Sequence, residues 1–243
     1  MCHNMEQSMW RGLPCFTDRV NVWLLPTEDL STVNGNEIFD KLPEKRRQKI
    51  SNCKILEKKK QSFGAGVLLF LLCQLLQERY GFTEKELEIQ YMPMGKPVFS
   101  RQVGASFSLS HTHGCAAIAF ALPDFASQKN QQLGMDIELI RECRMAVAKR
   151  FFTKEEYDYI FFQQENQQDA FFLIWTGKEA VMKKGGEGLK MPLTSFSVLQ
   201  QKKKDLFYTS FECGDRKYAM TICMDEAMSS YEPFLSWVDC AIL

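Results

Sequence analysis

The chain has 243 residues, of which 45% are hydrophobic and 12% aromatic. That is enough apolar surface to fill the core of one large domain or two small ones, and it excludes an intrinsically disordered chain. The formal net charge is zero, which argues against nucleic-acid binding driven by bulk charge.

The neutral total conceals two regions of opposite charge. Between Lys41 and Lys60 there are nine Lys or Arg residues against two Glu. From Asp205 to the C-terminus, seven acidic residues stand against two basic ones. The basic segment is therefore a local feature, and it suits a small polyanion better than a long one.

The cysteines and the hydropathy both indicate a cytoplasmic protein. Nine cysteines form no CxxC pair, and several lie inside apolar runs, a pattern typical of reduced and packed thiols. Residues 1–14 lack the apolar core of a signal peptide. The longest apolar run, 67–76, is shorter than the ~20 residues that cross a bilayer, so we expect no membrane span.

The first half is predicted to begin with a strand at 20–25 and a basic helix that starts near Pro43. A helix over 67–81 follows, and its apolar residues on nearly all sides predict burial. The basic residues of the first helix and its continuation include Lys45, Arg46, Arg47, Lys49, Lys58, Lys59 and Lys60. Two interpretations of this charge run stay open, a solvated helix face and a phosphate-binding edge.

A short strand at 88–91 and a turn at 94–97 come next. Pro97 limits the conformations of this turn, so the turn is expected to present Lys96 in a fixed position.

Strands at 107–110 and 115–122 form a predicted hairpin. Its connector is His111-Thr112-His113-Gly114. These residues are open to three interpretations: packed or capping histidines, donors to a phosphate, or an HxHxC zinc pattern, which is weak because no second ligand cluster accompanies it.

The polar stretch 123–132 is the best candidate for a boundary between two halves. The elements predicted after it are a strand at 133–140, helices at 142–150, 154–165 (capped by Thr153) and 167–184, and strands at 195–200, 206–211 and 218–223. Each half then has strands and one principal helix, which indicates an α+β fold without a visible sequence repeat.

The second half carries three carboxylates in a suggestive arrangement. In LGMDIEL the apolar residues alternate with Asp136 and Glu138, and a period of two places both acids on one face of the strand. On the helix 167–184, Glu179 and Lys183 are four residues apart and share a face. Such a set suits a divalent cation that grips a phosphate. The alternatives are a solvated strand face and a surface ion pair.

The order of these segments resembles the Sfp-type 4′-phosphopantetheinyl transferases. The motifs that carry the resemblance are GKP at 95–97, FSLSHT at 107–112, GMDIE at 134–138, KRFFTKEEY at 149–157, WTGKEAVMKKGGEGL at 175–189 and PLTSFSV at 192–198. The similarity runs from about Leu42 to Cys223. GxDIE followed some forty residues later by WxxKEAxxK is specific as a combination.

The resemblance implies two similar α+β subdomains, 1–125 and 126–243, related by a pseudo-twofold axis with a coenzyme A (CoA) cleft between them. It implies a monomeric enzyme that moves the phosphopantetheine arm of CoA to a serine of an apo acyl or peptidyl carrier protein. The reaction would need Mg²⁺ and release adenosine 3′,5′-bisphosphate. Charge and hydropathy give no reason to expect a nucleic acid or a membrane as a partner.

The resemblance also assigns roles to individual residues. It implies that Asp136, Glu138 and Glu179 are the magnesium ligands, that Glu179 also activates the carrier serine, and that Lys183 faces the transferring phosphate. Glu179 and Lys183 are therefore the candidate catalytic residues. The CoA contacts it implies are Lys45, Lys49, Lys60, Lys96, Pro97, Ser110, His111, Thr112 and Lys183.

An alternative from another class is a non-catalytic module that keeps the CoA cleft or the carrier surface. The presence of all three carboxylates and of Lys183 favours the enzyme. Nucleic-acid binding through the segment 41–60 ranks third. The sequence does not determine which class of carrier protein is the target. The full two-subdomain length favours carriers of secondary metabolism.

Overall fold

A computed structural model describes residues 13–28, 30, 37–101, 103–123, 132–186, 191–200, 205–228 and 232–239. The strands are β1 (Asn21–Pro26), β2 (Ile89–Tyr91), β3 (Pro97–Phe99), β4 (Ser106–Thr112), β5 (Cys115–Ala121), β6 (Leu133–Leu139), β7 (Leu206–Cys213), β8 (Arg216–Met224) and β9 (Phe234–Trp237). The α-helices are α1 (Glu37–Lys41), α2 (Glu44–Ser51), α3 (Leu56–Tyr80), α5 (Met145–Phe151), α6 (Lys154–Phe162) and α7 (Gln167–Gly185). Single 3₁₀ turns lie at Gln164–Asn166, Leu193–Ser195 and Glu226–Met228.

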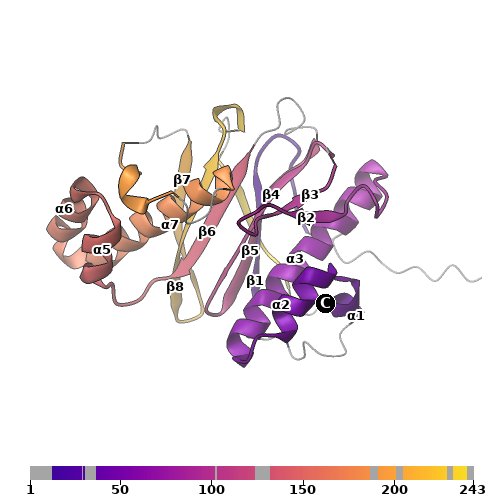
Figure 1. Cartoon of the computed structure of the whole chain (residues 1–243), viewed down its shortest axis with the longest axis horizontal. Helices are drawn as coiled ribbons and strands as arrows, with labels where there is room; N and C mark the ends of the chain where they lie inside the picture. The colour runs from indigo at the N-terminus through magenta and orange to yellow at the C-terminus, as the bar shows by residue number, and fades with distance from the viewer. Residues whose placement is uncertain are drawn as a thin grey trace, which may run out of the picture.

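The main elements stack as helix, sheet, sheet and helices (Figure 1). The first sheet has the strand order β4-β5-β1-β9, the second has the order β6-β8-β7, and β2 and β3 form a separate hairpin. One face of the first sheet packs against α3, and the other face packs against the second sheet. The far face of the second sheet is covered by α5, α6 and α7. The predicted α+β class is confirmed.

Strands β1 and β5 are covered on both faces, which is why they lack a polar side. Toward α3, the rings of Trp23 and Phe120 meet edge to face with their centroids 4.6 Å apart. Toward the second sheet, β5 presents small residues such as Ala117 and Ala119, both fully buried. Small side chains at this level let the two sheets approach closely.

Helix α3 begins at Leu56, so the prediction of a separate helix starting at 67 was wrong at this end. Gly64 and Gly66 lie inside the helix, where a Cβ at Gly64 would come 2.9 Å from Thr27 Cγ2 and one at Gly66 would come 2.7 Å from Leu42 Cδ1. Both glycines therefore serve close packing, and they do not interrupt the helix.

Most other predicted elements are confirmed within a few residues, with two exceptions. His111 and Thr112 belong to β4, and the connector is only the turn at His113 and Gly114, whose φ is +78°. The predicted strand at 195–200 was wrong, because residues 193–195 form a 3₁₀ turn and residues 196–200 form no strand. Buried charged side chains, described below, bind the backbone of this segment in place of a neighbouring strand.

The predicted boundary at 123–132 lies mostly outside the described residues, which resume at Gln132. Beyond it, β9 returns to the first sheet and pairs in parallel with β1, with Phe234 opposite Asn21. Strand β9, the last among the described residues, therefore completes the sheet of the first half.

Within the described ranges, no helix is both long and apolar enough to cross a bilayer. The seven cysteines in those ranges are free thiols.

Candidate active site

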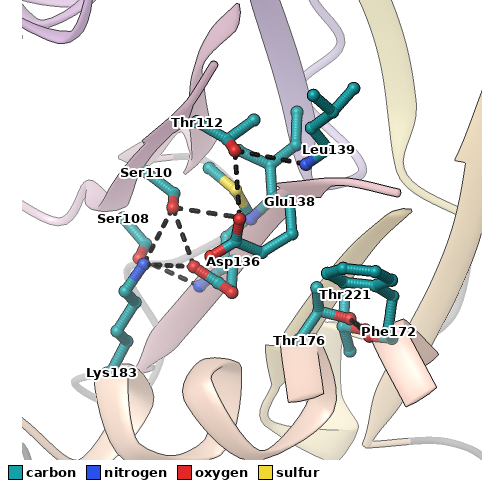
Figure 2. A network of polar contacts seen from close by, with 12 residues as sticks. Ser108, Ser110, Thr112, Asp136, Glu138, Leu139, Phe172, Thr176, Lys183 and Thr221 are labelled. Carbon is teal, nitrogen blue, oxygen red and sulfur yellow. Dashed lines mark hydrogen bonds and ion pairs between the residues drawn. The ribbon is translucent and has the colours of Figure 1, made fainter. Parts of the chain in front are cut away.

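Strands β4 and β6 run side by side where the two sheets meet, and side-chain hydroxyls join them (Figure 2). The hydroxyls of Ser108, Ser110 and Thr112 accept hydrogen bonds from three alternate amides of β6 at 2.9, 3.4 and 3.2 Å. Residues two apart share one side of a strand, so the alternation S-x-S-x-T supplies this row of acceptors. Hydroxyls thus take the place that backbone carbonyls have between ordinary paired strands.

Asp136, Ser110 and Lys183 form a closed triangle at this seam (Figure 2). Lys183 Nζ donates to Asp136 Oδ1 at 2.7 Å and to Ser110 Oγ at 2.9 Å. Ser110 in turn donates to Asp136 Oδ1 at 2.8 Å. Asp136 is only 5% exposed, and its second oxygen, Oδ2, is buried with no hydrogen-bond partner in the described part of the chain.

Glu138 lies one step further along the same face of β6. Thr112 Oγ1 donates to Glu138 Oε2 at 3.0 Å. Burial, followed by the charge of Asp136, raises the pKa of the Glu138 carboxyl to about 7. Glu138 lines a second cavity of about 620 Å³ together with Arg141, Arg144 and Trp175.

Helix α7 lies directly on β6 because β6 carries a glycine at the contact. A Cβ at Gly134 would collide with Ala180 O and with the backbone of Lys184. This close approach carries Glu179 and Lys183 to the Asp136 side of β6. Burial, followed by the Asp136 charge, raises the pKa of Glu179.

A buried ion pair fixes α7 next to Glu179. Lys178 and Glu156 are 1% and 0% exposed, and Lys178 Nζ lies 2.8 Å from Glu156 Oε2. The ammonium also donates to Leu193 O and Phe196 O, each at 2.6 Å. Glu156 accepts from Val198 N at 2.8 Å and closes the capping box of α6 with Thr153. These bonds hold the backbone of 193–198, which explains why no strand forms there.

A cavity of about 340 Å³ opens beside the triangle, between α2, the β2–β3 turn, β4 and α7. Its charged and polar lining includes Arg46, Lys49, Lys96, Ser110, His111, Asp136, Glu179 and Lys183. We call it the central cavity.

The lining of the central cavity carries more cations than carboxylates, with Arg46, Lys49, Lys96 and Lys183 against Asp136 and Glu179. Arg46 is 7% exposed, and its Nε is buried with no hydrogen-bond partner among the described residues. Burial, followed by the charges of Lys49, Lys183 and Arg46, lowers the pKa of His111 to about 4, which keeps its imidazole neutral. Burial also lowers the pKa of Lys96 to about 8. Such a cavity is suited to a polyanion, whose charge would compensate these cations.

The three carboxylates have the chemistry of a site for a hard cation. Oxygen ligands suit Mg²⁺, the Asp136 charge raises the pKa of both glutamates, and Asp136 Oδ2 is buried without a partner. A cation between them would relieve this repulsion. As they stand in the described structure, however, no three His, Cys, Asp or Glu side chains converge on a metal position. That finding also gives no support to the zinc interpretation of the two histidines and Cys115.

The structure gathers most, but not all, of the residues that the sequence singled out. Lys49, Lys96, Pro97, Ser110, His111, Asp136, Glu179 and Lys183 line the central cavity. Lys96 Nζ donates to Leu133 O and Lys184 O at 3.0 and 3.2 Å. Lys45 Nζ lies 4.4 Å from the centre of the Tyr91 ring, in a separate groove. Lys60 Nζ donates to Glu28 O at 2.7 Å. Thr112 and Glu138 lie further along the seam.

Two cavity or seam residues were missed as candidates from the sequence. Arg46 was counted only within a charge run, but Leu42, Arg46 and Ile50 recur every four residues and are all buried. That spacing was a signal that Arg46 belongs to the inward face of α2. Ser108 was missed as well, although it continues the alternation with Ser110 and Thr112.

The chain is similar in sequence to a family of enzymes. Residues 132–227 match the model of the 4′-phosphopantetheinyl transferase superfamily. The chain is 29% identical over 184 residues to the 4′-phosphopantetheinyl transferase Sfp of Bacillus subtilis (strain 168), covering 68% of this chain and 78% of that protein. It is 28% identical over 207 residues to the 4′-phosphopantetheinyl transferase HetI of Nostoc sp., covering 76% of this chain and 78% of HetI. It is 35% identical over 102 residues to the 4′-phosphopantetheinyl transferase AcpT of Salmonella typhimurium, covering 41% of this chain and 50% of AcpT.

A seam of hydroxyls, a carboxylate cluster and a cation-lined cavity, all inside the matched region or facing it, define a group-transfer enzyme for a phosphorylated substrate. The chain is thus similar to the 4′-phosphopantetheinyl transferase superfamily over residues 132–227, and to its Sfp-type enzymes over about two thirds of its length.

Proposed function

We propose that this protein transfers the 4′-phosphopantetheine group of CoA to a serine hydroxyl of an apo carrier protein, with Mg²⁺, and releases adenosine 3′,5′-bisphosphate. The observation that carries the proposal is the meeting of Asp136, Glu179 and Lys183 at the edge of the cation-lined central cavity. CoA is a polyanion with a pyrophosphate at the bond to be broken, and it needs both of these features.

Asp136, Glu138 and Glu179 would hold the metal. Bound there, Mg²⁺ would neutralise charge on the pyrophosphate oxygens and so let an oxygen nucleophile approach. The carboxylates supply only oxygen ligands, and the unpartnered Asp136 Oδ2 supports this assignment.

Glu179 and Lys183 would act on the reacting atoms. The serine oxygen forms a bond to the β-phosphorus of CoA, the bond to the bridging pyrophosphate oxygen breaks, and the serine proton passes to Glu179. Its raised pKa suits Glu179 to accept that proton. Lys183 would balance the charge that develops on the departing phosphate.

Lys49 and Arg46 would meet phosphate groups of CoA within the central cavity, with Lys96, Pro97, Ser110, His111 and Thr112 along its wall and the adjoining seam. Lys45 and Lys60 remain proposed contacts of the 3′-phosphate. Their ammonium groups would have to leave Tyr91 and Glu28 O to reach it.

The carrier serine would enter from the other side of the carboxylates, where the second cavity lies. Arg141 and Arg144 line that cavity, and Phe171 and Trp175 form an apolar wall with their rings stacked at 8°. Glu138 and Glu142 line the same cavity. Arg141 and Arg144 would pair with acidic side chains of a carrier, while the two rings pack against its apolar ones.

We further propose that the protein works as a cytoplasmic monomer built of two pseudo-twofold related halves, 1–125 and 126–243. In support, each half contributes an antiparallel pair of strands covered by one long helix, α3 or α7. The proposed cleft is the central cavity between them. No nucleic acid and no membrane has a part in this proposal.

The test is intact-mass analysis of apo carrier proteins incubated with the enzyme, CoA and Mg²⁺. We expect a gain of one phosphopantetheine that is lost with EDTA and with Asp136→Asn, and that is kept with Asp158→Asn, which changes an exposed carboxylate paired with Lys154. Carriers of fatty-acid, polyketide and nonribosomal-peptide systems would be ranked in the same assay. Binding of CoA without any gain on several carriers would instead support the non-catalytic module.

A further inference from the structure

Lys183 is bound to the carboxylate that the proposed metal requires. Its ammonium lies 2.7 Å from Asp136 Oδ1, while its side chain is 29% exposed and that of Asp136 only 7%. A carboxylate with so little access to water needs a positive partner in the interior. Lys183 is that partner among the described residues, because Asp136 takes part in no other ion pair there.

Ser110 holds the ammonium in this position. Its hydroxyl donates to Asp136 Oδ1 and accepts from both Lys183 Nζ and Ile137 N, at 2.8, 2.9 and 3.4 Å. One donor and two acceptor positions are all that a serine hydroxyl has, so Ser110 is fully used within the protein. Lys183 and Asp136 are thereby fixed in one geometry.

This arrangement leaves the carboxylates incomplete as a metal site. No three acidic, histidine or cysteine side chains of the described structure converge on a metal position. Asp136 Oδ2 stays buried without a hydrogen-bond partner, while Oδ1 is shared by two donors. An oxygen so buried and unpaired remains able to accept a further bond, and a positive group would satisfy it.

We propose that Lys183 is an internal counter-ion that competes with the divalent cation for Asp136 and is released to the phosphate when the cation binds. Competition follows because an ammonium on Oδ1 and a hard cation on Oδ2 would share one carboxylate. The two positive groups repel each other, and each weakens the bond of the carboxylate to the other. Lys183 lines the central cavity, so its released ammonium would need only a side-chain rotation to reach the phosphates of CoA bound there.

This competition sets the order of two steps, in which the cation binds first and Lys183 is released second. Before the cation and CoA arrive, Lys183 stabilises the buried Asp136 and has one proton left for other partners. Once displaced, it becomes the free cation that the departing phosphate needs. The inference rests on the proposed function, since it assumes that Asp136 is a metal ligand.

The test measures Mn²⁺ binding to the CoA-free protein by the loss of the free-ion signal in electron paramagnetic resonance. Lys183→Met removes the competing charge at nearly constant length, and we expect it to bind Mn²⁺ about fivefold more tightly than the wild type. Lys49→Met is the matched control, because it removes one cation from the same cavity that makes no ion pair with a carboxylate of the described structure. We expect it to change Mn²⁺ affinity less than about twofold.

Equal affinities of Lys183→Met and the wild type, or an equal gain in Lys49→Met, would overturn the inference while leaving the metal site intact. Asp136→Asn separates the two ideas. Its expected result is a loss of Mn²⁺ binding, and wild-type affinity in this variant would overturn the metal assignment of the proposed function and this inference with it.

A second measurement needs no variant. Lysine acetylation followed by peptide mass spectrometry reports how accessible each ammonium is in the wild-type protein. We expect Mg²⁺ to raise the acetylation rate of Lys183 severalfold and to leave that of Lys49 unchanged. An unchanged or slower rate at Lys183 in the presence of Mg²⁺ would contradict its release.

Discussion

Lys178 Nζ lies 2.8 Å from Glu156 Oε2 between α6 and α7, and neither residue reaches solvent. All three protons of the ammonium are used, on Glu156, Leu193 O and Phe196 O. Lys178 precedes Glu179 in the chain, so the pair also sets the rotation of α7 that turns Glu179 toward Asp136.

Removing one partner of this pair should destabilise the protein strongly. Lys178→Met leaves a buried carboxylate and two carbonyls unpaired, so we expect a loss of about 3–5 kcal/mol in the free energy of unfolding. Urea denaturation followed by circular dichroism measures it. Lys154→Met is the control, because the pair of Lys154 with Asp158 is exposed and should contribute less than about 1 kcal/mol. Similar losses in the two variants would show that the buried pair is not a structural anchor.

The hydroxyl seam gives a second prediction within a single strand. Ser108→Ala leaves the buried amide of Met135 without its acceptor, so we expect a loss of about 1–3 kcal/mol in the free energy of unfolding. Ser106→Ala is the matched control, since Ser106 Oγ is buried with no hydrogen-bond partner in the described structure and its removal should be nearly neutral. A loss at Ser106 equal to that at Ser108 would argue against the seam as a source of stability.

The sequence predicted elements that local pattern determines, and it failed where long-range contacts determine the backbone. Local pattern was sufficient for β6, because a period of two places Asp136 and Glu138 on one face, and for α6, because Thr153 is a recognisable cap. The strand predicted at 195–200 was wrong because its backbone groups are bound by Lys178 and Glu156, which lie 18 and 42 residues away from them in the chain. Neither hydropathy nor turn residues carry such a long-range contact.

The candidate site also has features that the sequence predicted and features that it could not predict. The spacing of Glu179 and Lys183 predicted only that they share a helix face, and the family resemblance assigned them to the site. Both line the central cavity. The ion pair of Lys183 with Asp136 was not predictable, because it depends on how closely α7 approaches β6. That distance is decided by the packing at Gly134, which a one-dimensional pattern does not contain.

Gly134 therefore gives a prediction that links packing to activity. Gly134→Ala pushes a methyl group into Ala180 O and the backbone of Lys184, which are rigid parts of α7. We expect the free energy of unfolding to fall by about 3 kcal/mol because of overpacking. We also expect the transfer rate to fall, because Glu179 and Lys183 move away from Asp136. Thermal unfolding and the carrier mass assay measure the two effects.

Gly177→Ala on the same helix is the comparison for that variant. A Cβ there comes 3.3 Å from Val198 Cγ1, a much milder contact than the one at Gly134, and alanine favours the helix by about 1 kcal/mol. We therefore expect a much smaller loss of stability than in Gly134→Ala. If Gly134→Ala proved as stable and active as Gly177→Ala, then α7 would not be positioned by its contact with β6.

His111 predicts how stability depends on pH. Burial and then the neighbouring charges of Lys49, Lys183 and Arg46 lower the pKa of its imidazole from 6.5 to about 4 in the folded protein. The unfolded chain therefore takes up a proton below about pH 6.5 that the folded protein refuses until about pH 4, so the folded state loses stability as the pH falls through this window. At 1.36 kcal/mol per pKa unit, the full loss is about 3 kcal/mol.

His111→Gln cannot titrate, so its free energy of unfolding, measured in urea, should run parallel to that of the wild type above pH 7. Between pH 6.5 and 4 the wild type should lose more stability than the variant does, by about 3 kcal/mol in total. Parallel curves across the whole range would mean that the imidazole of His111 charges as easily in the folded protein as in the unfolded chain.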